Sequence, residues 1–357
     1  MPIDYEVVKL DKGTDSFYSA YRLQQTIECS PEFVINPDDT SSRICRFCRK
    51  REPEVTFNNK AHLIPFLIGN QHLLSNFECD CCNAYFSKYE SDLARFLSVQ
   101  RTFNRIRKRK GGVAGFNTYN KDVSVEHVES SDSIVLKVDK SNPQENAISH
   151  DESTDTLTIT FQTQDYRPLR VYKALIKIAL SVMSEDEMKH YEYALKYLTT
   201  EQYDKDEAMA FPVDWWTTCW DQPFENVKVS IFKKIDPQNL IPTHVMFLYV
   251  GWSVFVVPIP FYKPDMYLFH KRKIGFYFPA KVTDDSQANI FDGGHRDVFL
   301  TSSNELTSRT DRINIGNNGV LQSYLFATGE PTEEKMNVEK VWAVIFAPDA
   351  TYIAQGH

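Results

Sequence analysis

Two short stretches decide the fold of the N-terminal part of this chain: CRFCRK, Cys45–Lys50, and CDCCNAYF, Cys79–Phe86. Each contains a C-x-x-C pair, whose tight turn lets two sulfurs reach one metal ion. Zn²⁺ favours four thiolate or imidazole ligands in tetrahedral geometry. The predicted ligands of a structural Zn²⁺ are therefore Cys45, Cys48, Cys79 and Cys82. Cys81 makes the second pair ambiguous, because it is a further thiol inside that pair.

The composition is that of a globular protein with more than one domain. The chain has 357 residues, 42% hydrophobic and 25% charged, and its length predicts at least two domains. The N-terminal sequence lacks the pattern of a secretion signal, and the cysteine count of seven is odd. We therefore expect a reducing compartment, the cytoplasm, and metal ligation rather than disulfides.

One apolar stretch, residues 245–262, has about the minimum length of a membrane span. Gly251 lies in its middle, and Pro258 and Pro260 interrupt its end. It is rich in Val, Phe and Tyr, which favour strands. We expect two buried strands around a turn here, and no membrane association.

The rest of the chain indicates an α+β fold. Apolar side chains recur at helical spacing over 168–183, and Ser184–Glu187 has the pattern of a capping box that opens a second helix. A helix is also expected directly after the last cysteine pair, with an apolar stripe at Phe86, Tyr89, Leu93 and Leu97. Strands are predicted at 133–138, 156–161, 227–232, 274–278 and 341–347.

Charge is unevenly spread. Residues 41–111 carry 14 Lys and Arg against 6 Asp and Glu, although the whole chain has a net charge of −8. This basic island coincides with the cysteine pairs and predicts a surface that binds a polyanion. Its last part contains the cations Arg101, Arg105, Arg107, Lys108, Arg109 and Lys110. They can neutralise nucleic-acid phosphates, or simply solvate a helix end before a hinge.

Residues 43–97 resemble the zinc-stapled HNH endonucleases. The resemblance rests on the paired C-x-x-C knuckles, on AHLIPFLIGN between them, and on an Asn directly after the last Cys. It implies an N-terminal ββα-metal (treble-clef-like) module. We expect residues 1–112 to form this module with an N-terminal extension and a basic linker. Residues 113–357 are then a larger α+β domain that senses a signal, targets the enzyme or oligomerises.

The resemblance also implies roles for single residues. His62 becomes the general base, because a neutral imidazole can take a proton from water that attacks a phosphodiester. Asn83 becomes a ligand of the catalytic Mg²⁺ or Mn²⁺, and Asn76 matches the Asn that braces the ribbon.

The sequence departs from the family at Ala61, where many members have an acidic metal ligand. One neutral Asn would be poorly matched in charge to Mg²⁺. Glu90 is the candidate for the missing anion, because it follows Asn83 by two turns on one helix face. The alternative for Glu90 is a surface charge, and His72 is a candidate assistant.

These features predict an endonuclease that hydrolyses nucleic-acid phosphodiesters, DNA rather than RNA. By analogy it would act in bacterial defence or in a mobile element.

Two alternatives stay open. One is a non-catalytic zinc module that binds nucleic acid or a partner, and Ala61 favours it. The other is that the acidic C-terminal part binds a ligand and the zinc module controls it. A homodimer and an activating ligand or protein are further expectations.

Overall fold

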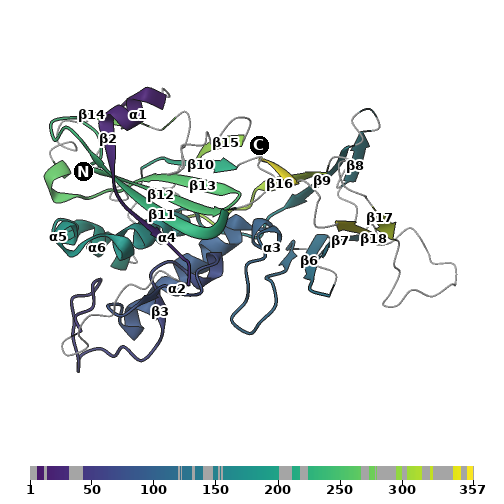
Figure 1. Cartoon of the computed structure of the whole chain (residues 1–357), viewed down its shortest axis with the longest axis horizontal. Coiled ribbons are helices and arrows are strands. Elements are labelled where there is room, and N and C mark those ends of the chain that lie inside the picture. The colour runs from purple at the N-terminus through teal and green to yellow at the C-terminus, as the bar shows by residue number, and fades with distance from the viewer. Residues whose placement is uncertain are drawn as a thin grey trace. The chain divides into compact units, whose positions relative to one another are not determined.

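The computed structural model describes most of the chain, namely residues 6–11, 14–31, 43–119, 121, 123–130, 133–139, 148–151, 153, 156–200, 211–217, 224–266, 273–277, 279, 295–299, 304–315, 322–324, 341–346 and 352–356. The fold is α+β, as predicted, and its elements are labelled in Figure 1.

The chain forms two compact units, each built from separate stretches of sequence. Unit 1 comprises residues 1–93, 167–218 and 224–305, and unit 2 comprises residues 94–166, 219–223 and 306–357. The Cys-rich region therefore shares unit 1 with later parts of the chain, and the units do not follow the expected boundary after residue 112. The division into a module of residues 1–112 and a domain of residues 113–357 stays a prediction.

A six-stranded antiparallel sheet forms the centre of unit 1. Its strand order is β15-β10-β13-β12-β11-β2. The bounds are β2 Tyr21–Glu28, β10 Val213–Thr217, β11 Phe224–Lys234, β12 His244–Gly251, β13 Ser253–Pro258 and β15 His295–Phe299. Strands β12 and β13 are buried along their whole length, so the predicted pair within residues 245–262 is confirmed. Within the described residues, no helix is both long and apolar enough to cross a membrane.

Helix α4, Pro168–Val182, is the central helix of unit 1 and confirms the predicted apolar period. It begins with Pro at its first turn, where the missing N–H costs nothing. Nearly all of its side chains are buried. The helix contacts β11, and its residues Arg170 and Lys177 form ion pairs with Asp92 and Glu90 of α2, Asp80–Leu97. Figure 1 labels both helices. It therefore links the central sheet to the Cys-rich region.

The single helix predicted after Ser184 is divided in two. Two short helices stand there, α5 Glu185–Met188 and α6 Glu192–Thr199, and the side chain of Ser184 makes no capping hydrogen bond. The carboxylate of Glu187 accepts hydrogen bonds from the side chains of Tyr262 and Lys233. The capping-box pattern therefore does not produce a continuous helix.

The Cys-rich region is small and has little regular structure besides α2. A two-stranded ribbon, β3 Ala61–His62 and β4 Leu74–Ser75, is joined by a loop with a 3₁₀ turn, η2 Phe66–Ile68. Helix α2 follows. Its predicted apolar stripe is fully buried at Phe86, Tyr89, Leu93 and Leu97. Packing of this stripe, rather than strand pairing, holds the region together.

Unit 1 also contains the parallel pair β1 Glu6–Asp11 and β14 Lys273–Tyr277, helix α1 Thr14–Ala20, and the 3₁₀ turn η3 Lys263–Asp265.

Unit 2 contains two antiparallel sheets. One has the order β19-β16-β9-β8 and the other β17-β18-β7-β6-β5. The bounds of its elements are α3 Gln100–Phe103, β5 Phe116–Asn117, β6 Val123–Val128, β7 Ser133–Asp139, β8 Ile148–Asp151, β9 Thr156–Gln162, β16 Thr310–Ile315, β17 Gln322–Tyr324, β18 Val341–Phe346 and β19 Tyr352–Gly356. The strands predicted at 133–138, 156–161 and 341–347 are all present.

Candidate active site

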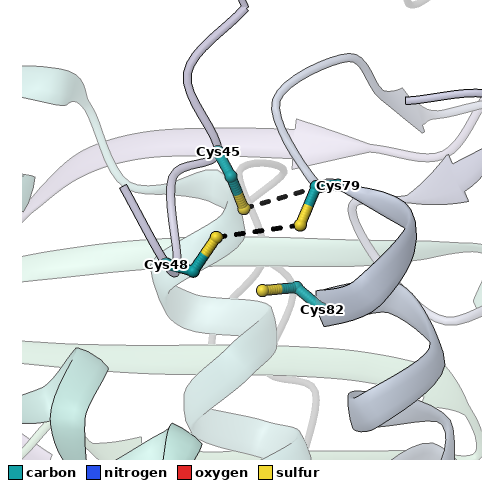
Figure 2. Close-up of side chains that lie close together, drawn as sticks. All are labelled: Cys45, Cys48, Cys79 and Cys82. Atoms are coloured by element: carbon teal, nitrogen blue, oxygen red, sulfur yellow. Dashed lines mark hydrogen bonds between the residues drawn. The ribbon is translucent and has the colours of Figure 1, made fainter. Parts of the chain in front are cut away.

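The four predicted zinc ligands form one cluster. The sulfurs of Cys45, Cys48, Cys79 and Cys82 all lie within 4.8 Å of one another (Figure 2). The sulfurs of Cys48 and Cys79 are 3.8 Å apart. A tetrahedral Zn²⁺ with Zn–S bonds of about 2.3 Å needs sulfurs separated by about 3.8 Å. The cluster therefore fits Zn²⁺, and Cys81, which is exposed, is the spare thiol.

Local backbone geometry brings the two pairs to this point. In the first pair a turn is closed by hydrogen bonds from Arg49 N to Cys45 O and from Cys45 N to Lys50 O. In the second pair Cys79 immediately precedes α2, and its carbonyl accepts the N–H of Asn83. The positive end of a helix dipole favours thiolates at this place.

Thiol chemistry in the cluster indicates a metal site. A hydrogen bond from Cys82 lowers the pKa of Cys45 to about 4. Burial raises the pKa of Cys79 to about 12, and the hydrogen bond to Cys45 together with burial raises the pKa of Cys82. Without an ion, the cluster thus favours a thiolate at Cys45 and thiols at Cys79 and Cys82. A bound dication would change this mixed protonation state, because each sulfur that coordinates it is deprotonated.

The ribbon carries His62 on β3, between the two cysteine pairs in the sequence. His62 pairs with Leu74, and Ala61 pairs with Ser75. The imidazole is half-buried and lies edge-on to the ring of Phe66, with ring centroids 5.6 Å apart. The ribbon has only two residues in each strand, so strand pairing alone gives it little rigidity.

Asn70 braces the loop of this ribbon. Its side-chain amide donates to the carbonyls of Ile64 and Leu73, and its side-chain oxygen accepts from the N–H groups of His72 and Leu73. The residue is fully buried, and this set uses both polar ends of the amide. Asn70 thus braces the loop, and the bracing role of Asn76 stays a prediction. Asn76 follows β4 and is half-buried.

Asp80, the first residue of α2, binds the segment that precedes β3 in the sequence. Its carboxylate accepts hydrogen bonds from the hydroxyl of Thr56 and from the N–H groups of Asn58 and Asn59. These bonds lower its pKa. The strand that carries His62 thus begins from a segment fixed on the helix that carries Asn83.

Lys177 of α4 is the least expected member of the site. Its ammonium lies 3.1 Å from the main-chain oxygen of His62, 3.0 Å from Glu78 Oε2 and 3.4 Å from Glu90 Oε1. Lys177 and Glu78 are almost completely buried. Burial lowers the pKa of Lys177, but the two carboxylates outweigh this effect and raise it. The lysine therefore remains charged at neutral pH.

This arrangement changes the role expected for Glu90. Its carboxylate faces the ammonium of Lys177 instead of being an unpaired ligand for a divalent ion. Ala61 is fully buried, and His72 is exposed. Among the described residues, the cysteine cluster is the one group of three or more His, Cys, Asp or Glu side chains that could hold a metal. Asn83 is half-buried and lies directly after Cys82 on α2.

Arg46, between the first two cysteines, anchors the zinc knuckle to the end of α4. Its guanidinium donates to the carbonyls of Leu180, Ser181 and Met183 at 2.7–3.0 Å, and to the carboxylate of Glu185 at 2.6 Å. The last carbonyls of a helix have no partner within the helix, and a cation there also complements the helix dipole. Arg46 thus caps α4 from outside.

The basic run forms a tight turn in unit 2 rather than a helix end with a hinge. Arg107 and Val113 form a β-bridge, and the N–H of Lys108 donates to Gly112 O. Gly111 and Gly112 both have positive φ, which this turn requires. The four cations at 107–110 are exposed, and so is Arg105. Arg101 is half-buried in α3, and burial lowers its pKa, so the five others are the better phosphate ligands.

Comparison with known proteins identifies the region that contains this site. Residues 45–96 match the family model described as HNH endonuclease. The curated proteins and the solved structures give no significant match. The matched segment begins at the first cysteine of the cluster, includes the ribbon and almost all of α2, and agrees with the resemblance inferred from the sequence.

Proposed function

Because residues 45–96 form a four-cysteine HNH endonuclease region, we propose that the protein is an endonuclease that hydrolyses DNA phosphodiester bonds. One observation carries the proposal. The four-cysteine cluster, the ribbon with His62 and the helix with Asn83 occur in one continuous segment, and that segment matches the family.

In the proposed reaction His62 is the general base. Its neutral imidazole takes a proton from a water molecule while the water oxygen forms a bond to phosphorus and the bond from phosphorus to the 3′ oxygen breaks. Such a base contributes about 10²- to 10⁴-fold to a rate. Lys177, Asn70 and the Asp80 network support this role, because they fix the backbone on both sides of His62.

A divalent ion would stabilise negative charge on the scissile phosphate and the departing oxygen. Asn83 is the residue proposed to contact it. Because Ala61 is apolar and Glu90 faces Lys177, we expect Mg²⁺ or Mn²⁺ to bind together with DNA, whose phosphates bring the missing negative charge. Binding of Mg²⁺ to the DNA-free protein should accordingly be weak.

The exposed turn at 107–110 is the proposed contact to the DNA backbone. Four adjacent cations attract phosphates without reading sequence. A role in bacterial defence or in a mobile element, a cytoplasmic location, a homodimer and an activating ligand remain predictions from the resemblance and composition.

Plasmid nicking tests the proposal. Purified, zinc-loaded protein should convert supercoiled plasmid to the nicked form with Mg²⁺ or Mn²⁺, and EDTA should stop the reaction. Asn83→Ala should lower the nicking rate. The alternative, a zinc module that only binds nucleic acid, predicts a gel shift of the same plasmid without any cleavage. Binding without nicking at all metal concentrations would therefore reject the nuclease proposal.

A further inference from the structure

Lys177 connects three parts of the HNH region to a helix that lies outside it in the sequence. The lysine is in α4, whereas its three acceptors are on β3, on the segment before Cys79, and on α2. The ammonium lies within 3.4 Å of three oxygens, namely His62 O, Glu78 Oε2 and Glu90 Oε1. The surroundings are dry, because the side chains of Lys177 and Glu78 are at most 1% exposed.

A buried ammonium fixes its partners more strongly than an exposed one. In a dry interior the charge must stay paired, and removing one member leaves an uncompensated charge behind. The main-chain oxygen of His62 is therefore fixed to α4 by a charge-assisted hydrogen bond, which is stronger than a neutral one.

The ribbon needs such support. Each strand has two residues, so the position of His62 depends on groups outside the ribbon. Asn70 fixes the loop that joins the two strands through its hydrogen bond to Ile64 O. Lys177 fixes the main chain of His62 itself. A displacement of a catalytic group by about 1 Å can cost about 100-fold in rate.

We propose that Lys177 is a positioning residue that fixes His62 for catalysis, so that α4 helps to set the geometry of the HNH site. The inference rests on the proposed function, because it assigns His62 the role of general base. Lys177 has no chemical step of its own. It acts through the His62 carbonyl, and its two carboxylate partners hold the ammonium in place.

Lys173 provides a matched control on the same helix. It lies one turn earlier and is equally buried, and its ammonium also donates to main-chain carbonyls, those of Tyr197 and Thr200. These carbonyls belong to the end of α6 and not to the ribbon. Replacing either lysine by Met removes a buried amine that donates to main-chain carbonyls, but only Lys177→Met releases His62.

The test compares Lys177→Met, Lys173→Met and wild type by single-turnover nicking at saturating DNA, with zinc content, melting temperature and DNA affinity measured in each. Lys177→Met should lower the nicking rate by about 10- to 100-fold with unchanged DNA affinity. Lys173→Met should stay within about twofold of wild type. Lys177→Arg, which keeps a donor, should recover part of the rate. An unchanged rate in Lys177→Met, or an equal loss in both Met variants, would overturn the proposal.

Two further arms keep the test decisive. Should Lys177→Met not fold, Lys177→Met combined with Glu78→Gln and Glu90→Gln removes the unpaired charges while still releasing His62. Should the wild type not nick DNA, NMR of histidine-labelled protein gives an independent readout. The ring signal of His62, identified by its loss in His62→Gln, should shift in the Lys177 variant and not in Lys173→Met. An unchanged His62 signal would reject the positioning role, whereas absent nicking alone would reject only the nuclease proposal.

Discussion

Arg46 donates from its guanidinium to the main-chain oxygen of Ser181 at 2.7 Å. This hydrogen bond joins the zinc knuckle to the last turn of α4. Lys177, one turn earlier on the same helix, joins α4 to His62. One buried helix thus contacts the metal-binding turn and the ribbon of the candidate active site.

Arg46→Ala should destabilise the protein, because three helix-terminal carbonyls lose their donor while they remain buried. We expect a loss of about 2–4 kcal/mol in the free energy of unfolding, little of it from the ion pair, since Glu185 is 64% exposed. Denaturant unfolding of zinc-loaded protein measures this loss. Lys50→Ala, which alters an exposed cation of the same turn, should change the free energy by less than about 0.5 kcal/mol. Equal effects of the two substitutions would contradict the capping role.

Cys82→Ser should lose the bound zinc and most of the stability that zinc confers, because a serine hydroxyl is a poor ligand for Zn²⁺. Metal analysis after purification and a thermal melt check both effects. The neighbouring Cys81→Ser is the matched control, since Cys81 is exposed and lies outside the cluster. It should keep one zinc per chain and the wild-type melting temperature. Loss of zinc in Cys81→Ser would mean that the ligand set is wrong.

Zinc binding should release protons and weaken as the pH falls. In the metal-free cluster the pKa of Cys79 is raised to about 12 and that of Cys82 is also raised, so both are thiols at pH 8. Each must lose its proton to bind Zn²⁺, which predicts release of about two or more protons per ion. Stability conferred by zinc is thus present at higher pH and lost toward acid. Calorimetric titration with zinc in two buffers of different ionisation enthalpy measures the proton count, and a count of zero would contradict this thiol assignment.

The exposed turn at 107–110 should dominate the salt dependence of DNA binding. Replacing Arg107, Lys108 and Lys110 by Ala should weaken binding and reduce the slope of log K against log salt by about two to three. A control that removes three other exposed lysines, Lys189, Lys196 and Lys263, changes net charge equally and should leave the slope nearly unchanged. Equal slopes of log K against log salt in the two triple variants would show that the turn at 107–110 makes no particular contact with the DNA backbone.

The sequence predicted those features that depend on local spacing. The C-x-x-C pairs identified the zinc ligands, since a knuckle brings its two sulfurs together whatever surrounds it. The period of Phe86, Tyr89, Leu93 and Leu97 predicted the buried face of α2. The composition of 245–262 predicted β12 and β13, because Gly251 separates two apolar runs and Pro258 and Pro260 end the second.

The contacts that join distant parts of the chain could not be predicted in this way. Lys177 lies 115 residues from His62 and 87 from Glu90, and nothing in its helical pattern indicates these partners. The bracing role of Asn70 was missed for a related reason. Both Asn70 and Asn76 lie near the ribbon, and only the folded loop shows which amide meets its main-chain groups.

The most direct test of the account compares nicking by His62→Ala with nicking by His72→Ala, at equal zinc content and saturating divalent ion. His72 belongs to the same ribbon loop but is exposed, so it controls for loss of an imidazole from this region. The account predicts that His62→Ala keeps its zinc and its fold and loses at least about 100-fold in rate, while His72→Ala nicks within a few-fold of wild type. Wild-type nicking by a folded, zinc-loaded His62→Ala would contradict the assignment of His62 as the general base.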